Sequence, residues 1–329
     1  MPGIGLVLGA GGVVGHAFHA GVLAAVTEAT GWDPREADVI VGTSAGSVVG
    51  ALLRGGASAP DLLARASGEP VSEAGRRLIA RADAAQSHLS PIPTRPERAR
   101  IPVMSAPGAL VRAARKPWAT RPGALAAAML PEGRIPTELV AAGLRPLFTG
   151  WPDEPLWINA VQLDTGTRIT FGRDTFSAVD VADAVAASCA IPAFFAPVVI
   201  DGVRYVDGGV HSPTNADLLA GLGLDLVIVS SPMSIAGNGL RVAADQPARR
   251  FARFALGREV ARVRRQGTPV LTFQPTTSDI AVMGFNAMDE SRRAPVARGT
   301  YESALERIAR ADAGERTAIL RRSAPSRTA

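Results

Sequence analysis

The sequence predicts an α/β protein, and three observations lead to that prediction. Short apolar runs at residues 4–8 and 39–41 are typical of buried strands, and each precedes a glycine-containing turn and a segment with helical spacing of apolar residues. Two further apolar runs, at 224–230 and 270–273, would add core strands. The chain has 329 residues, 47% of them hydrophobic, so it is long enough for one large domain with a substantial core.

The first unit combines the strand at residues 4–8 with a glycine loop and a helix. A loop of this kind presents unpaired N–H groups and the positive end of the helix dipole, which suit a phosphate or the oxyanion of acyl transfer. The dinucleotide fingerprint would need glycine where Val14 stands, and the loop lacks the G-K-[ST] of a phosphate loop. A nearby serine motif favours the oxyanion, with the N–H groups of Gly11, Gly12 and Val13 as expected donors.

That serine motif is Gly42-Thr43-Ser44-Ala45-Gly46, which matches G-x-S-x-G between the second strand and a small apolar helix. The motif alone can occur by chance in a chain rich in glycine and alanine. Strand, sharp turn and helix are, however, the context that a nucleophile elbow requires. Gly42 and Gly46 have no Cβ and so would let Ser44 project its hydroxyl into the open.

A serine nucleophile needs a base, and histidine is poorly placed to supply it. The four histidines are His16, His19, His88 and His211. The order Ser, Asp, His leaves His88, which lies in a Pro/Arg-rich stretch, and His211, which follows Asp207 by only four residues. Asp207 itself ends a predicted hairpin and is followed by two glycines, so it is the candidate base. Asp201 competes, but it sits at the hairpin turn, where aspartate is a common turn former.

These motifs carry a family resemblance. The glycine loop, G-T-S-A-G, the block Ala-Ser-Cys-Ala-Ile-Pro-Ala-Phe-Phe-Ala-Pro at 187–197 and Asp-Gly-Gly at 207–209 occur in the order of the patatin-like phospholipase family. The chain resembles that family over residues 4–235, although Val14 stands where the family usually has Arg or Lys. The resemblance implies a three-layer α/β/α fold with a central, mostly parallel sheet.

The resemblance also implies a function. By position, Ser44 is expected to be the nucleophile, Asp207 the general base, and Gly11, Gly12 and Val13 the oxyanion hole. The expected reaction is hydrolysis of lipid acyl esters through an acyl-enzyme, without metal or cofactor. One alternative is a transacylase, in which an alcohol or thiol replaces water. Another is a non-catalytic lipid-binding regulatory protein.

Charge is unevenly distributed. Residues 76–121 hold ten basic and two acidic residues, with six prolines, so a loop-rich insertion or lid is expected at 85–135. The insertion would belong to a single catalytic domain at residues 1–322, followed by a disordered tail at 323–329.

A second basic stretch, Arg249–Arg265, has seven arginines among apolar residues at helical spacing, which indicates an amphipathic helix. Both stretches could be solvated surface, or a rim that meets anionic lipid. Nucleic acid is not expected as a partner, because no recognised motif occurs and only 5% of residues are aromatic.

The remaining features concern the compartment. The single cysteine, Cys189, allows no internal disulfide, suits a reducing compartment and is expected to serve packing. No basic segment precedes residues 4–8, and no apolar run reaches the length of a membrane span. The expected location is the cytoplasm, with peripheral contact at the inner face of the membrane. The sequence predicts no oligomeric state, and residues 283–289 suggest nothing beyond loop packing.

Overall fold

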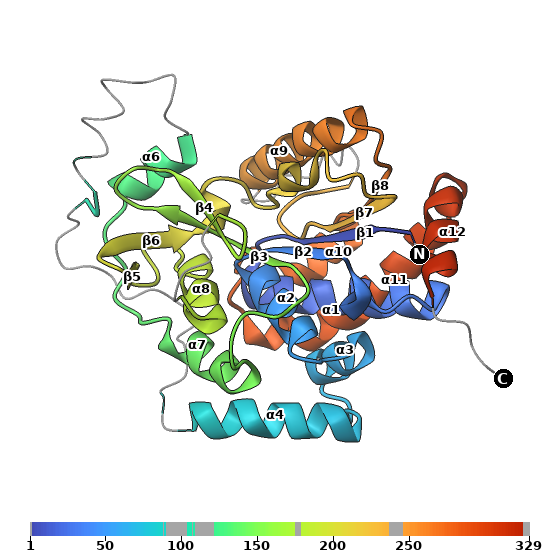
Figure 1. The fold of residues 1–329 in the computed structure, drawn as a ribbon, viewed down its shortest axis with the longest axis horizontal. Coiled ribbons are helices and arrows are strands. Elements are labelled where there is room, and N and C mark those ends of the chain that lie inside the picture. Colours follow the sequence, from blue (N-terminus) through green and yellow to red (C-terminus); the bar gives the residue numbers. More distant parts are fainter. Residues whose placement is uncertain are drawn as a thin grey trace.

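The structure is a computed structural model in which helices cover both faces of one sheet (Figure 1). It describes residues 2–87, 89, 104–106, 108, 122–174, 179–236 and 246–324. The expected α/β fold with a mostly parallel sheet is confirmed. Most of the Pro/Arg-rich stretch lies outside the described residues, as do His88 and the end of the chain after Ala324.

The sheet has eight strands. They are β1 (Ile4–Leu8), β2 (Val39–Thr43), β3 (Leu156–Gln162), β4 (Arg168–Phe171), β5 (Val198–Ile200), β6 (Val203–Asp207), β7 (Leu226–Ser230) and β8 (Val270–Phe273). The order is β5-β6-β3-β2-β1-β7-β8, with β4 also paired to β3. Strands β3, β2, β1, β7 and β8 run parallel, whereas β4, β5 and β6 join by antiparallel pairing.

Eleven α-helices occur among the described residues. They are α1 (Gly12–Thr30), α2 (Ala45–Arg54), α3 (Ala59–Ser67), α4 (Glu73–Gln86), α6 (Pro122–Met129), α7 (Glu138–Leu144), α8 (Val181–Ser188), α9 (Gln246–Arg265), α10 (Thr277–Met283), α11 (Arg293–Ala309) and α12 (Gly314–Ser323). The predicted basic helix is therefore confirmed as α9. No described helix has the length and apolar character needed to cross a bilayer.

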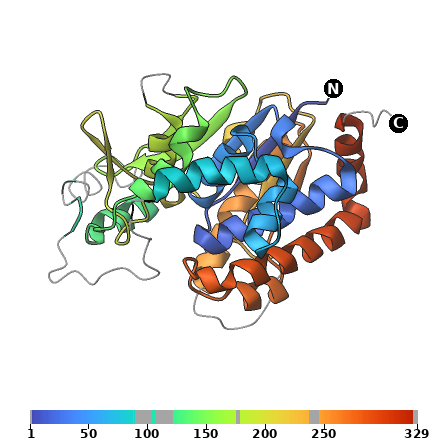
Figure 2. The ribbon, with the colours of Figure 1, turned by 90° about the horizontal axis from the view of Figure 1, so that it is seen from below.

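The alternating side chains of the strands build a core on each face of the sheet. Leu6 and Ile40 pack with α1, α2, α8 and α11. Val7 and Val41 point the other way and pack with α9 and the short helix η5 (Ala216–Leu219). Figure 2 shows α11 lying along α1 on the first of these faces. The result is the expected three layers, with the sheet in the middle.

The register of the parallel strands brings the glycine loop and the Ser44 turn to the same edge of the sheet. Leu8 of β1 lies opposite Gly42 of β2 on one side and Ser230 of β7 on the other. Because these three strands are parallel, their carboxyl ends meet at the same edge, the usual place for a site in an open α/β sheet. The glycine loop after β1 and the serine turn after β2 are thus neighbours.

Candidate active site

Ser44 occupies a sharp turn between β2 and α2. Its backbone has φ +54° and ψ −121°, a conformation that a non-glycine residue adopts only at a cost in strain. The adjoining glycines are required by close approach. A Cβ at Gly46 would lie 1.9 Å from the carbonyl oxygen of Leu8, and one at Gly42 would lie 2.5 Å from Cα of Ser47. The turn therefore has the geometry of a nucleophile elbow.

Asp207 is brought to this serine from the antiparallel side of the sheet. It is the last residue of β6 and pairs with Ala160 of β3, and its N–H donates to the carbonyl of Ala190 at 2.9 Å. The Ser44 side chain lies close enough to the Asp207 carboxylate to lower the pKa of that carboxylate. The N–H of Gly209 donates a hydrogen bond of 2.7 Å to the same carboxylate. Ser44 and Asp207 are 4% and 5% exposed, so both side chains are shielded from water.

Burial sets the proton affinity of this carboxylate. Loss of hydration raises the pKa of Asp207 from 3.8 to about 6, against the opposing effects of the Ser44 hydroxyl and the Gly209 N–H. A general base works best when its pKa lies near the working pH, because it is then both deprotonated and basic enough to take a proton. Asp207 approaches that condition, whereas an exposed aspartate would be a much weaker base.

The glycine loop presents free donors beside the elbow. Gly11 is the N-cap of α1, and among the described residues no acceptor receives the N–H groups of Gly11, Gly12 or Val13. The next N–H, that of Val14, donates to the carbonyl of Ala287 at 3.0 Å. The N–H groups of these three residues therefore lie without an acceptor at the positive end of the α1 dipole.

The loop at residues 284–289 holds this glycine loop in place, a role that the sequence did not suggest. Besides accepting from Val14, the carbonyl oxygen of Ala287 would lie only 2.7 Å from a Cβ placed at Gly12, whose φ is +60°. Both the backbone conformation and the lack of space therefore require glycine at position 12.

A polar network behind the elbow was also missed. The hydroxyl of Ser188, at the end of α8, accepts the N–H of Ser44 at 2.9 Å and donates to the carbonyl of Asn159 at 2.7 Å. The Asn159 amide in turn donates to the carbonyl of Gly42 at 3.2 Å. These buried bonds fix the backbone on both sides of the strained turn.

A second branch of the network ties the elbow to the loop after Asp207. The side chain of Asn215 donates to the Thr43 hydroxyl at 3.0 Å. Glu259 of α9 holds that loop from behind, because its carboxylate accepts from the Thr214 hydroxyl at 2.6 Å and from the N–H of Ala216 at 2.9 Å. The turn that carries Ser44 and the loop that follows Asp207 thus rest on one connected scaffold.

The two histidines nearest the glycine loop, His16 and His19, have pKa values lowered by burial. His19 is fully buried, with Nδ1 2.8 Å from the Ser230 hydroxyl and Nε2 2.8 Å from the carbonyl oxygen of Gly9. Burial lowers its pKa to about 4, and burial with the nearby charges of His19 and Arg293 lowers that of His16 to about 3. Burial also raises the pKa of the Cys189 thiol, which keeps it protonated and packed against Ser47.

His211 is the remaining described histidine, and its replacement is a test of the dyad. It follows the short helix Gly208–Val210 directly after Asp207. We expect His211→Asn to keep at least about a tenth of the wild-type rate, because Asp207 and not His211 is the expected base. A catalytic histidine would contribute about 10²-fold or more. Steady-state hydrolysis of a soluble ester would measure this. A loss above a hundredfold with an unchanged circular dichroism spectrum would replace the dyad with a triad.

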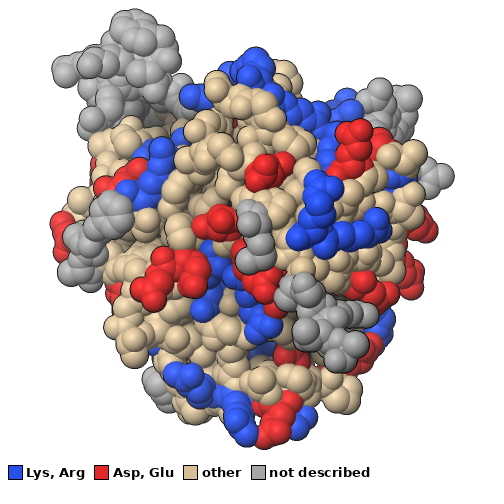
Figure 3. All heavy atoms as spheres, turned by 45° about the vertical axis from the view of Figure 1, so that its right-hand side comes forward, with Lys and Arg blue, Asp and Glu red and all other residues tan. Residues whose placement is uncertain are grey.

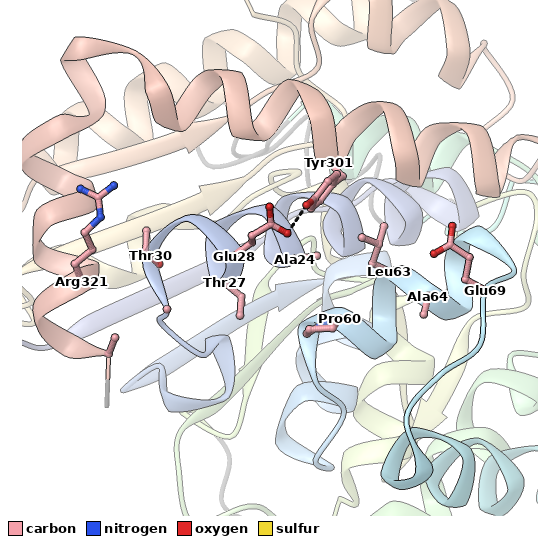
Figure 4. A pocket seen from close by; sticks show the side chains of 12 residues that line it. Ala24, Thr27, Glu28, Thr30, Pro60, Leu63, Ala64, Glu69, Tyr301 and Arg321 are labelled. Carbon is pink, nitrogen blue, oxygen red and sulfur yellow. Dashed lines mark hydrogen bonds between the residues drawn. The ribbon is translucent and has the colours of Figure 1, made fainter. Parts of the chain in front are cut away.

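A surface pocket of about 790 Å³ lies away from Ser44 and Asp207 (Figure 4). It is lined by the last turns of α1 with α3, α11 and α12, at the opposite end of α1 from Gly12. Figure 4 shows the Tyr301 hydroxyl bonded to Glu28 there, and neither Ser44 nor Asp207 lines it. Within the described ranges, no cluster of three His, Cys, Asp or Glu side chains could hold a metal ion.

A strained serine turn at the carboxyl edge of a mostly parallel sheet, with a buried carboxylate beside the serine, has the form of the nucleophile elbow found in α/β hydrolases. The model of the patatin-like phospholipase family matches residues 6–220, and the chain belongs to this family. The resemblance seen in the sequence is thereby confirmed.

Two solved structures show the extent of the similarity. VipD from Legionella pneumophila matches with 13% identity and a TM-score of 0.41, covering 93% of this chain and 66% of VipD. The type III effector protein ExoU matches with 18% identity and a TM-score of 0.30, covering 93% of this chain and 62% of ExoU. The chain thus spans less than two thirds of either protein. No curated protein matches it.

Proposed function

We propose that the protein hydrolyses acyl ester bonds of lipids with Ser44 as the nucleophile and Asp207 as the general base. Membership of the patatin-like phospholipase family supports the reaction class. The observation that carries the dyad is the placement of two buried side chains, that of Ser44 on a strained turn and the Asp207 carboxylate, close enough for the first to lower the pKa of the second.

The reaction follows from this geometry in two halves. Asp207 accepts the hydroxyl proton while Oγ of Ser44 attacks the ester carbonyl, and the open N–H groups of Gly11, Gly12 and Val13 stabilise the tetrahedral oxyanion. Collapse of the tetrahedral intermediate transfers the proton from Asp207 to the departing alcohol or lysolipid and leaves an acyl group on Ser44. Asp207 then takes a proton from water as the water oxygen attacks the acyl group. Collapse of this second tetrahedral intermediate breaks the bond to Oγ of Ser44, which takes the proton back from Asp207 as the fatty acid leaves.

Product analysis separates this function from its alternatives. A panel of short-chain esters, monoacylglycerols and phospholipids, each with and without an added alcohol or thiol acceptor, would measure both hydrolysis and acyl transfer. We expect free fatty acid as the main product. Transfer to the acceptor as the main product would make the protein a transacylase, and no turnover of any ester would favour a lipid-binding role.

The pKa of Asp207 predicts a pH dependence. The deprotonated carboxylate is the active form, so kcat/KM for a soluble ester should rise with pH, with a midpoint of about 6. Below the midpoint the rate should fall about tenfold per pH unit. Initial rates across this range, with circular dichroism to verify the fold, would test it. A profile that stays flat through pH 6, or one that turns near pH 4, would contradict a desolvated aspartate as base.

A further inference from the structure

Three phenylalanines are unusually exposed. Among the described residues, the aromatic side chains that lie on the surface are Phe251 at 55%, Phe254 at 64% and Phe285 at 84% exposure. Large aromatic side chains gain most from burial, so a group of them on the surface commonly marks a site of contact with a partner or a membrane.

Phe285 lies beside the glycine loop, next to the start of α9, the helix that carries Phe251 and Phe254. A small cavity of about 60 Å³ is lined by Gly11 together with Ala248, Arg249 and Phe285, so the start of α9 and the 284–289 loop meet beside the proposed oxyanion donors. The buried guanidinium of Arg249 anchors that end of α9, because it donates to the carbonyl oxygen of Pro232 at 2.9 Å. Pro232 follows β7, at the same edge of the sheet as the elbow.

Helix α9 turns a basic face outward. Its apolar side, with Ala252, Leu256, Val260 and Val263, is buried against the sheet. The opposite side carries Arg250, Phe251, Phe254, Arg258, Arg262 and Arg265, all of them exposed. In Figure 3, basic side chains run along the upper edge of the molecule, the height at which α9 lies in Figure 1.

No acidic group on α9 offsets this charge at the surface. Glu259 is the one acidic residue of the helix, and its carboxylate points inward to Thr214 and Ala216. The guanidinium of Arg258 lies 5.8 Å from the centre of the Phe254 ring, so cation and aromatic group share one patch. Aromatic rings among arginines match the interfacial layer of an anionic bilayer, where rings sit at headgroup depth and arginines pair with phosphate.

We propose that Arg250, Phe251, Phe254, Arg258 and Phe285, here termed the aromatic–arginine surface, dock the protein on an anionic lipid bilayer. The rings enter the headgroup layer and the guanidinium groups bind lipid phosphates. Docking places the glycine loop against the membrane that supplies the ester, so the inference extends the proposed function. Of the two basic stretches identified in the sequence, the proposal concerns the one that forms α9; most of residues 76–121 lies outside the described residues.

Vesicle sedimentation tests the docking directly. The probes are vesicles of phosphatidylcholine alone and vesicles that also contain phosphatidylglycerol, each at low and high salt. We expect the wild-type protein to bind the anionic vesicles at least about tenfold more tightly at low salt, and to lose that preference at high salt, because exposed charges are screened.

Two variants identify the surface. Phe251→Ser/Phe254→Ser should lower binding to anionic vesicles by about tenfold or more, because two rings that would be buried in the headgroup layer are lost. Arg250→Glu/Arg258→Glu should lower it by about 25-fold or more, since each arginine near such a surface contributes about fivefold. The matched control is Val199→Ser/Leu222→Ser, which removes two side chains of 63% and 45% exposure outside the aromatic–arginine surface. The control should bind like the wild type.

Hydrolysis of a soluble short-chain ester separates docking from chemistry. Both variants should keep that activity within about twofold, whereas hydrolysis of vesicle lipid should fall with binding. Vesicle binding without turnover of any ester would leave the docking in place and refute the proposed function. Equal binding to neutral and anionic vesicles, absence of binding, or equal losses in the control and the test variants would overturn the docking proposal.

Discussion

Ser44→Ala is expected to abolish ester hydrolysis and covalent labelling by a serine-reactive phosphonate at the same time. The change removes one oxygen, the proposed nucleophile Oγ. Without it no acyl-enzyme can form, and loss of the nucleophile in a serine hydrolase costs about 10⁴-fold to 10⁶-fold in kcat. The fold should survive, because the strained backbone of the elbow is held by bonds to its N–H and carbonyl groups and not by the hydroxyl.

Ser231→Ala provides the matched control for this variant. Ser231 is 1% exposed, follows β7 at the same edge of the sheet, and its hydroxyl has no hydrogen-bond partner among the described residues. The control should therefore keep both activity and labelling. Rates and labelling of both variants would be measured beside a thermal melt. Labelling that persists in Ser44→Ala would identify another residue as the nucleophile.

The elbow could be predicted from the sequence because its signals are local. The β-branched run of β2, the glycines on either side of Ser44 and the apolar spacing of α2 all lie within about fifteen residues, and each has a direct steric reason. Asp207 could be predicted for the same reason, since a hairpin signal directly precedes it in the sequence. That the Ser44 hydroxyl meets this carboxylate required the sheet order, in which β6 and β2 flank β3.

The supporting groups could not be predicted, because their contacts join distant parts of the chain. Ser188 lies in the conspicuous block before β5, yet nothing local indicates that its hydroxyl accepts the N–H of Ser44. Ala287 acts through a backbone carbonyl, which leaves no signature in the sequence. The same limit applies to α9, whose pattern predicts a basic helix without revealing that Arg249 is buried while Arg250 is exposed.

Asp207→Asn is expected to lower kcat by about 10⁴-fold, because an amide cannot accept the serine proton. The same variant should nevertheless be more stable than the wild type at neutral pH. Burial raises the pKa of Asp207 from 3.8 to about 6, so the folded state disfavours the charged carboxylate. This penalty is absent below pH 3.8 and grows as the pH rises to about 6, reaching about 3 kcal/mol.

The neutral amide removes that penalty, so the variant should unfold at a higher temperature than the wild type at pH 7 to 8, and the difference should vanish towards pH 4. Thermal melts across pH, together with kcat for a soluble ester, would measure both effects. Intact mass would verify that the new amide, which precedes Gly208, has not deamidated to aspartate. A variant that keeps more than about a tenth of kcat would exclude Asp207 as the base. One that is inactive but less stable at neutral pH would show that the carboxylate is charged and stabilising there, contrary to its burial.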